Sequence, residues 1–326
     1  MHSQPIKNPG LGRPGFFEYT GDFVHKIVDT AQNALRLEVL TTPKPGLVDR
    51  NNNGSHRDMD MDMFFASTEA IAPFLGEMAA LGLHHDRKID DGLFPKLREA
   101  GIRAEKEMFA STNGVNTHKG MIFSMGTICG AAGWYYRSFG KLDVYTILKL
   151  CGKMTSAALE RDLAAISHTK RANHAVKKGL SVSSTHGENA YGRYGIKGVR
   201  GEVLAGFPTV RELSLPRWQK SFKKTVDEND VCVQTLLHLM AHVDDTCVIS
   251  RGGIEALAYV KEAARRTLAA GGIFAPNGVQ ILEDLDRAFI SKNLSPGGSA
   301  DMLAVTIFCG KLLDCRTDRK HDPVRI

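Results

Sequence analysis

The sequence predicts an all-α fold, a multi-helix bundle whose functional loops lie at helix ends. Three observations support this prediction. Apolar residues recur about every 3.6 positions along most of the chain, the alternation typical of strands is scarce, and Gly, Pro, Asn and Asp gather between the apolar stripes. Helices with one apolar stripe bury that stripe against one another, which favours a bundle.

The first predicted element is an N-terminal arm, because residues 1–20 contain three prolines and no clear apolar period. A helix then begins near Asp22, follows a stripe that includes Val24, Ile27 and Leu35, and ends near Pro43. Similar stripes predict helices at 60–83, 92–110, 119–138, 143–166, 226–243, 253–270, 277–290 and 299–313. We therefore expect a single helical domain at 21–313 and a C-terminal tail at 314–326.

A glycine-rich stretch at about 179–217 interrupts this helical pattern. Seven glycines alternate there with Arg193, Lys197 and Arg200, and a long regular helix would carry a large propensity penalty. A loop of this length in a compact domain is usually a lid, a binding loop or a linker. We favour a glycine-rich lid because tyrosines and charges of both signs accompany the glycines, and a linker is the alternative.

Composition narrows the class of protein. The 326 residues carry a formal net charge of +6 that is spread over many segments, which suits an anionic small substrate as well as nucleic acid. The six cysteines form no CxxC pair and are expected to be reduced thiols, mainly in the core. No apolar run approaches the ~20 residues of a membrane helix, so we expect a cytoplasmic protein without a membrane partner.

The first polar loop, at 44–58, joins two apolar helices and is crowded with charged and amide side chains. Its candidate site residues are Lys44, Asp49, Asn53, His56 and Asp58. On a helix, Asp58 and Asp62 would share a face and could share a metal ion. The alternatives are a solvated connection and acids that favour a helix start through its free amides and dipole.

The second polar loop, at 113–120, leads into an apolar helix. Its candidates are Asn116, His118, Lys119 and Gly120. Free amides at this helix start, together with a lysine, would form a cradle for phosphate. The chain lacks GxxxxGK[ST], so it is not a standard nucleoside triphosphatase. In the alternative interpretation Thr117 caps the helix, and Gly126 and Gly130 allow close helix packing.

Three further polar segments contribute candidates: Glu188 with Arg193 and Arg200, Asp245 with Arg251, and Gly297 and Gly298 with Asp301. Arginines on a glycine-rich backbone can close over phosphates. Asp244 and Asp245 follow a predicted helix, where two acids oppose the dipole and repel each other, which indicates a bound metal or a catalytic carboxylate. A wet turn is the alternative for that pair, and a simple first-turn acid for Asp301.

These segments form five ordered blocks: KPGLVDRNNNGSHRDM at 44–59, GVNTHKGMIF at 114–123, HGENAYGRYGIKGVRGE at 186–202, DDT with RGG at 244–253, and NLSPGGSADMLA at 293–304. Together they resemble the triphosphoribosyl-dephospho-CoA synthase family, which acts in prosthetic-group assembly for citrate lyase and malonate decarboxylase. The resemblance spans about residues 25–313 and implies that the helical domain is catalytic.

The resemblance implies transfer of the triphosphoribosyl group of ATP to the ribose 2'-hydroxyl of 3'-dephospho-CoA, with adenine as the leaving group. Such a reaction needs a base for the hydroxyl, a proton for adenine and negative charge near the sugar. The triphosphate needs Mg²⁺ together with Lys and Arg. The product is a precursor of an acyl-carrier prosthetic group, so a separate phosphoribosyl-dephospho-CoA transferase and an acyl carrier protein are expected partners.

By that logic the catalytic candidates are Asp49, Glu188, Asp245 and His118. The substrate-binding candidates are Lys44, Asn53, His56, Asn116, Lys119, Gly120, Arg193, Arg200, Arg251, Gly297 and Gly298, and the metal candidates are Asp58, Asp245 and Asp301. Which carboxylate is the base and which binds metal stays open.

Two other classes of function are compatible with the sequence. A helical nucleoside or ADP-ribose hydrolase would direct the same carboxylates at water. A basic helical RNA-binding protein would use the net charge, but no basic stripe interleaved with aromatic residues is present, so no nucleic-acid partner is expected.

Overall fold

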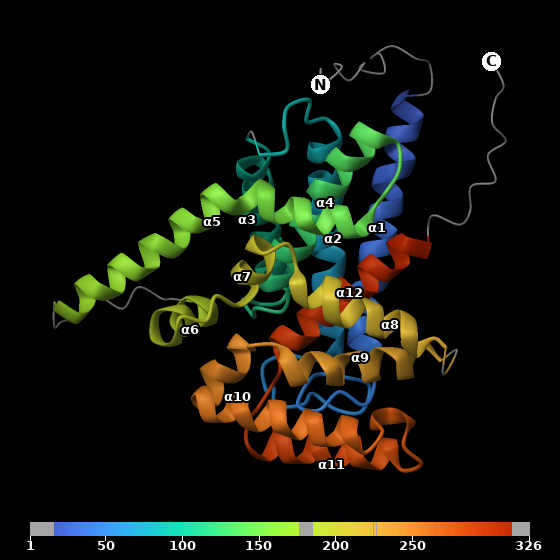
Figure 1. Cartoon of the computed structure of the whole chain (residues 1–326), viewed down its shortest axis with the longest axis vertical. Coiled ribbons are helices and arrows are strands. Elements are labelled where there is room, and N and C mark those ends of the chain that lie inside the picture. The colour runs from blue at the N-terminus through green and yellow to red at the C-terminus, as the bar shows by residue number, and fades with distance from the viewer. Residues whose placement is uncertain (1–15, 91, 176–184, 224, 226, 315–326) are drawn as a thin grey trace, which may run out of the picture.

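The computed structural model describes residues 16–90, 92–175, 185–223, 225 and 227–314, and all regular elements in these ranges are helices (Figure 1). They are α1 (Phe16–Leu40), α2 (Met61–Leu83), α3 (Leu93–Ser111), α4 (Lys119–Phe139), α5 (Val144–Ala175), α6 (His186–Tyr194), α7 (Gly198–Leu204), the π-helix η1 (Thr209–Ser214), α8 (Leu215–Ser221), α9 (Glu228–His242), α10 (Thr246–Ala269), the 3₁₀ helix η2 (Gly272–Phe274), α11 (Gly278–Ser291) and α12 (Gly297–Asp314). The all-α prediction is confirmed for the part of the chain that is described.

Figure 1 shows two groups of helices along the long axis of the molecule. Helices α1 to α5 form one end, α10 and α11 form the other, and α8, α9 and α12 lie between them. Helix α2 packs against α1, α3 and α4, while α12 packs against α1, α8 and α9. The predicted arm overlaps α1, which begins at Phe16, and the remaining arm and tail residues, 1–15 and 315–326, lie outside the described residues.

Helices α2 and α4 approach so closely that their backbones touch. A Cβ on Gly82 would lie 1.9 Å from the Gly130 carbonyl oxygen, and one on Gly133 would lie 2.0 Å from the Ala79 carbonyl oxygen. Glycine removes the side chain that would hold the two helices apart. A Cβ on Gly126 or Gly130 would likewise overlap Met78 of α2 or Leu97 of α3, so the interpretation of these two glycines as close-packing residues is confirmed.

The loop at 41–60 is built around two buried carboxylates. Asp49 accepts hydrogen bonds from the amides of Lys44, Asn51 and Asn52. Asp286 of α11 accepts from the Gly46 amide and from the Asn52 side chain. These contacts fix the loop against α11 and hold its polar residues at one end of the bundle.

The stretch from His186 to Ser221 is not a long loop, as the sequence suggested, but a series of short helices, α6, α7, η1 and α8. Thr185 and Glu188 form a capping box at the start of α6, and Gly195 ends it with φ +71°. Glycines at helix ends separate short helices at little cost, whereas they would break one long helix. Residues 179–184 lie outside the described residues.

A second correction concerns Asp244 and Asp245. The predicted connection before residue 253 is helical, because α10 begins at Thr246 and bends at Gly253, where φ is +74°. Asp245 is the N-cap of α10 rather than an acid at the end of α9. An N-cap carboxylate is favoured by the helix dipole, so the repulsive arrangement inferred from the sequence does not exist.

Two expectations from composition can be checked. No described helix combines the length and apolarity needed to cross a membrane. Among the described cysteines, Cys129, Cys151, Cys232 and Cys309 are buried free thiols, and Cys247 is a partly exposed one, as expected for reduced core residues. Cys315 lies outside the described residues.

Candidate functional site

A cavity of about 1180 Å³ lies where the two groups of helices meet. It is bounded by the 41–60 loop, the first residues of α4, α10 and α12, and parts of α3, α5, α6 and α7. The sequence-predicted residues that line it are Lys44, His56, Asp58, Asn116, His118, Lys119, Gly120, Arg200, Asp245, Arg251, Gly297, Gly298 and Asp301. Asp49, Asn53, Glu188 and Arg193 do not line it.

The first residues of α4 and α12 give the cavity a positive character that does not depend on side chains. Lys119 and Gly120 open α4, and Gly297 and Gly298 open α12; all four line the cavity. The first amides of a helix lack carbonyl partners within the helix, and its dipole attracts negative charge. These helix starts favour an anionic ligand, and at α12 the Asp245 carboxylate already accepts one of the free amides, that of Ser299.

Asp301 differs from the other acids at the cavity, because no hydrogen bond or ion pair joins its carboxylate to any other described residue. Its Oδ2 lies 2.4 Å from the position that a Cβ on Gly120 would take, so only glycine at 120 allows the carboxylate to approach the start of α4. Burial raises the pKa of Asp301 well above its usual range, and the neighbouring charges of Glu38 and Asp245 add to the rise. A carboxylate with a raised pKa and free oxygens can accept a proton from a ligand.

Asp245, by contrast, has both oxygens occupied. Oδ1 accepts from the amides of Cys247 and Val248 at 2.9 and 3.3 Å, and Oδ2 accepts from the amide and hydroxyl of Ser299 at 2.7 and 3.0 Å. The side chain thus joins the start of α10 to the first turn of α12. Burial raises the pKa of Asp245, and the bonds from Ser299 oppose that rise.

Asp49 and Lys44 bond to other groups of the protein, and Asn53 does not line the cavity. The Asp49 carboxylate accepts hydrogen bonds from the amides of Lys44, Asn51 and Asn52, and burial raises its pKa. Asn53 is exposed and lies outside the cavity. Lys44 is only 2% exposed, and its Nζ donates to the Glu38 carbonyl at 2.7 Å and to the Glu38 carboxylate at 2.6 Å. Both charges of this buried pair act on cavity residues: the Lys44 ammonium lowers the pKa of His118, and the Glu38 carboxylate raises the pKa of Asp301.

Arg251 joins the end of the 41–60 loop to the segment before α12 by hydrogen bonds. Its Nη1 donates to the Ser55 carbonyl at 2.9 Å and to the Asn293 side-chain oxygen at 2.8 Å, and its Nη2 faces the ring of His56. Burial, followed by the charge of Arg251, lowers the pKa of His56. Asp58 lies before α2 rather than on it, so it does not share a helix face with Asp62 as predicted, and its carboxylate is exposed.

His118 is almost fully buried at the start of α4. Its Nδ1 lies 2.6 Å from the Ser67 hydroxyl, which in turn accepts from the Thr117 hydroxyl at 2.7 Å. Thr117 therefore bonds to α2 instead of capping α4, where the N-cap residue is His118 itself. Nε2 has no partner among the described residues, and burial, with a smaller effect of Lys44, lowers the pKa of His118 to about 3. The imidazole is therefore neutral near pH 7.

The remaining basic residues at the cavity are mostly paired with acids. Lys119 bonds Glu105 of α3 at 2.8 Å, and Arg200 bonds Glu188 at 3.0 Å. Although partial burial favours the neutral acid, the hydrogen bond from the Thr185 amide and the charge of Arg200 lower the pKa of Glu188. Arg193 lies in the last turn of α6, exposed and outside the cavity.

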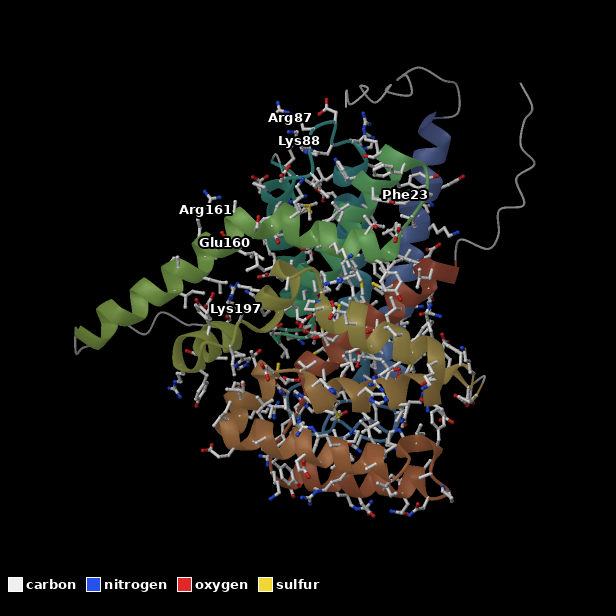
Figure 2. The ribbon with its side chains drawn as sticks, in the orientation of Figure 1. Phe23, Arg87, Lys88, Glu160, Arg161 and Lys197 are labelled. Atoms are coloured by element: carbon white, nitrogen blue, oxygen red, sulfur yellow. The ribbon has the colours of Figure 1, made fainter. Side chains whose placement is uncertain are left out.

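Two cavity residues were missed in the sequence. Lys197 lies between α5 and α6 in Figure 2, lines the cavity, and has no hydrogen bond or ion pair from its ammonium to the described residues. Glu38 is a buried acid inside the apolar stripe of α1. A charged residue within an apolar stripe is a usable signal for a buried pair, whereas Lys197 is a basic residue of the glycine-rich stretch that is not among the candidates selected there.

The metal candidates do not form a protein-only site. Within the described ranges, no group of three or more His, Cys, Asp or Glu side chains is arranged to hold a metal ion. Asp245 has no free oxygen pair. Of the other two metal candidates, Asp301 has no hydrogen-bond or ion-pair partner among the described residues, and Asp58 is an exposed carboxylate 3.7 Å from His56 Nδ1. An ion there would need most of its ligands from a bound molecule or from water.

Comparison with known proteins identifies relatives over most of the chain. A model of the CitG family, ATP:dephospho-CoA triphosphoribosyl transferase, matches residues 25–320. A probable 2-(5''-triphosphoribosyl)-3'-dephosphocoenzyme-A synthase of Photobacterium profundum is 43% identical over 277 residues, which cover 84% of this chain and 83% of that protein. The 2-(5''-triphosphoribosyl)-3'-dephosphocoenzyme-A synthase of Pectobacterium atrosepticum is 42% identical over 274 residues, covering 84% and 85%. No solved structure matches the chain.

Proposed function

The chain belongs to the CitG family of ATP:dephospho-CoA triphosphoribosyl transferases, and from this membership we propose the reaction that its cavity performs. The triphosphoribosyl group of ATP passes to the ribose 2'-hydroxyl of 3'-dephospho-CoA. The bond between C1' and adenine breaks, a bond between C1' and the acceptor oxygen forms, and the triphosphate stays intact. The hydroxyl proton goes to a base, and adenine leaves with a proton.

The observation that carries this proposal is the Asp301 carboxylate, which has no hydrogen-bond or ion-pair partner among the described residues, at a cavity that also presents helix starts and basic side chains. The helix starts at α4 and α12, together with Lys119, Lys197 and Arg200, suit a triphosphate and a diphosphate. Asp301 lies at the start of α4 with free oxygens and a raised pKa. We assign it as the base that takes the proton of the attacking hydroxyl, and its negative charge also suits a sugar with oxocarbenium character.

His118, one of the catalytic candidates, does not supply the proton that adenine needs. A pKa of about 3 means that the ring carries no proton to give near pH 7. If Ser67 donates to Nδ1, then Nε2 carries the hydrogen of the neutral ring, and the unpartnered Nε2–H can donate a hydrogen bond to an acceptor atom of the nucleotide. We assign His118 to orienting the nucleotide, and water to supplying the proton of adenine.

Mg²⁺ fits this site as a companion of the triphosphate. Magnesium commonly binds through one or two carboxylates, substrate phosphates and water, which matches a cavity without a protein-only metal group among the described residues. When bound, the ion offsets part of the phosphate charge. Asp58 at the exposed edge is the carboxylate we assign to it; Asp245, whose oxygens are occupied, is not.

Helices α6 and α7 flank the cavity, and α7 carries Arg200, so they are the elements we assign to a lid over bound phosphates.

The product still needs transfer to an acyl carrier protein. We expect a separate phosphoribosyl-dephospho-CoA transferase to perform that step.

The test is mass spectrometry of the purified protein incubated with ATP, Mg²⁺ and dephospho-CoA. We expect adenine and the triphosphoribosyl adduct in equal amounts, and no adenine when dephospho-CoA is omitted. Adenine release without the acceptor would instead identify a hydrolase.

Asp301→Asn should lower kcat by about 10²-fold or more. Asp284→Asn, at an exposed position of α11, serves as the matched control. If Asp301 held the metal instead, the variant would raise the Mg²⁺ requirement and recover activity at high Mg²⁺.

A further inference from the structure

One wall of the cavity differs in character from the anionic-ligand end. It consists of Phe94, Gly101 and Ile102 of α3, Phe123 of α4 and Leu159 of α5, which all line the cavity. Phe94 and Phe123 meet edge to face with ring centroids 6.3 Å apart. We call these five residues the apolar wall. These five residues carry no charge. The charged residues beside them in the cavity lining, Arg98 and Asp162, form an ion pair with each other, and the Arg98 guanidinium lies over the Phe94 ring. The wall therefore suits a ligand segment without net charge.

The apolar wall begins where the anionic-ligand end stops. The Lys119–Glu105 ion pair joins the start of α4 to α3, and the wall lies on the α3 turns that precede Glu105. From Phe94 to Glu105 the rise of an α-helix gives about 16 Å. The cavity therefore continues from a place for phosphates along roughly this length of α3, where apolar residues alternate with the paired Arg98.

Two details of α3 indicate that the wall faces open space. Ile102 is 61% exposed, more than any other large apolar side chain among the described residues. Gly101 stands next to it inside a helix, and a Cβ there would meet only the Met78 Cε at 3.6 Å and the Ile122 Cγ2 at 3.8 Å, which are ordinary contacts. Close packing therefore does not require glycine at 101, and the missing side chain leaves room for a ligand beside an exposed isoleucine.

We propose that the apolar wall binds the pantetheine arm of dephospho-CoA, an inference that rests on the proposed function. This arm is an uncharged chain of about thirteen backbone atoms, comparable to four extended residues or ~14 Å, which matches the wall. It leaves the diphosphate of dephospho-CoA, so its start lies at the anionic-ligand end. ATP has no such arm, and the wall accordingly distinguishes the acceptor from the donor.

Filling the wall tests the proposal. Gly101→Leu adds an isobutyl group over the wall, and we expect the KM for dephospho-CoA to rise by about tenfold or more while the KM for ATP stays within about twofold. Gly101→Ala is the matched control, because its methyl group fits the existing contacts, and its KM values should stay near those of the wild type. ADP, which is dephospho-CoA without the arm, should inhibit Gly101→Leu and the wild type equally.

A second variant covers the case in which Gly101→Leu does not fold. Ile102→Ser changes a surface side chain and should raise the KM for dephospho-CoA by roughly fivefold, while Ile290→Ser on α11, outside the cavity, should not. Unchanged KM values for dephospho-CoA, or equal rises for both substrates, would overturn the pantetheine assignment. A wild-type protein that releases no adenine with dephospho-CoA would overturn the proposed function instead, whatever the variants do.

Discussion

Asp245 provides a test of whether a carboxylate at the cavity acts in chemistry or in structure. Its four accepted hydrogen bonds join the start of α10 to Ser299 of α12, and it is 2% exposed. Asp245→Ala removes the N-cap, which costs about 1 kcal/mol, and the charge-assisted bonds from Ser299, which cost about 2–3 kcal/mol. We therefore expect a loss of about 3–4 kcal/mol. Asp245→Asn keeps an oxygen for the cap, and because burial already disfavours the charge, it should lose only about 1–2 kcal/mol.

Thermal unfolding followed by circular dichroism measures these losses. In a chain of this size each kcal/mol shifts Tm by about 2 °C, so we expect decreases of about 6–8 °C for Asp245→Ala and about 2–4 °C for Asp245→Asn. Below these transitions Asp245→Asn should release adenine within about threefold of the wild-type rate. A variant with wild-type Tm and a kcat lowered by about 10²-fold or more would refute the structural role and return Asp245 to the catalytic residues.

Three further predictions concern packing and charge. Gly133→Ala places a Cβ against the Ala79 carbonyl oxygen, so it should cost about 3 kcal/mol or more and lower Tm; a wild-type Tm would contradict the backbone contact between α2 and α4. Since the pKa of His118 is lowered to about 3, the folded state binds fewer protons than the unfolded state between pH 6.5 and 3. The folded state should therefore lose about 1.4 kcal/mol per pH unit from this group on acidification, a slope that His118→Gln should remove in denaturant unfolding. Because the pKa of Asp301 is raised, its ionisation destabilises the folded state as pH rises through that pKa. Asp301→Asn should consequently be inactive yet about 1–2 kcal/mol more stable at pH 8, and equal or lower stability by urea unfolding would contradict the raised pKa.

The long amphipathic helices could be predicted from the sequence because their stripes reflect local periodicity. The stripes at 60–83, 92–110 and 119–138 correspond to α2, α3 and α4 within two residues. The short helices after Thr185 could not be recognised from periodicity, since one or two turns hold too few apolar positions. Thr185 and Glu188 do match the S/T-x-x-E capping pattern, which was the available signal for α6.

The individual roles of the carboxylates could not be read from the sequence. Asp49, Asp245 and Asp301 all follow or precede turn residues in polar blocks, and nothing local separates them. Their partners do: the amides of its own loop occupy Asp49, while Ser299, distant in the chain, occupies Asp245. Asp301 is left without a partner among the described residues because Gly120 and α12 bring it to the cavity without donors. Such differences arise only when separate helices pack.

The ion pairs around the cavity have a consequence for selectivity. An anion that binds at Lys119 and Arg200 has to displace their present partners, Glu105 and Glu188. A singly charged competitor gains little from that exchange, because it substitutes one negative charge for another. A chain of several phosphates offers more charge at each contact and reaches both cations at once. If phosphates bind at Lys119 and Arg200 as proposed, we expect these resting pairs to disfavour small anions and to favour molecules that carry several phosphates.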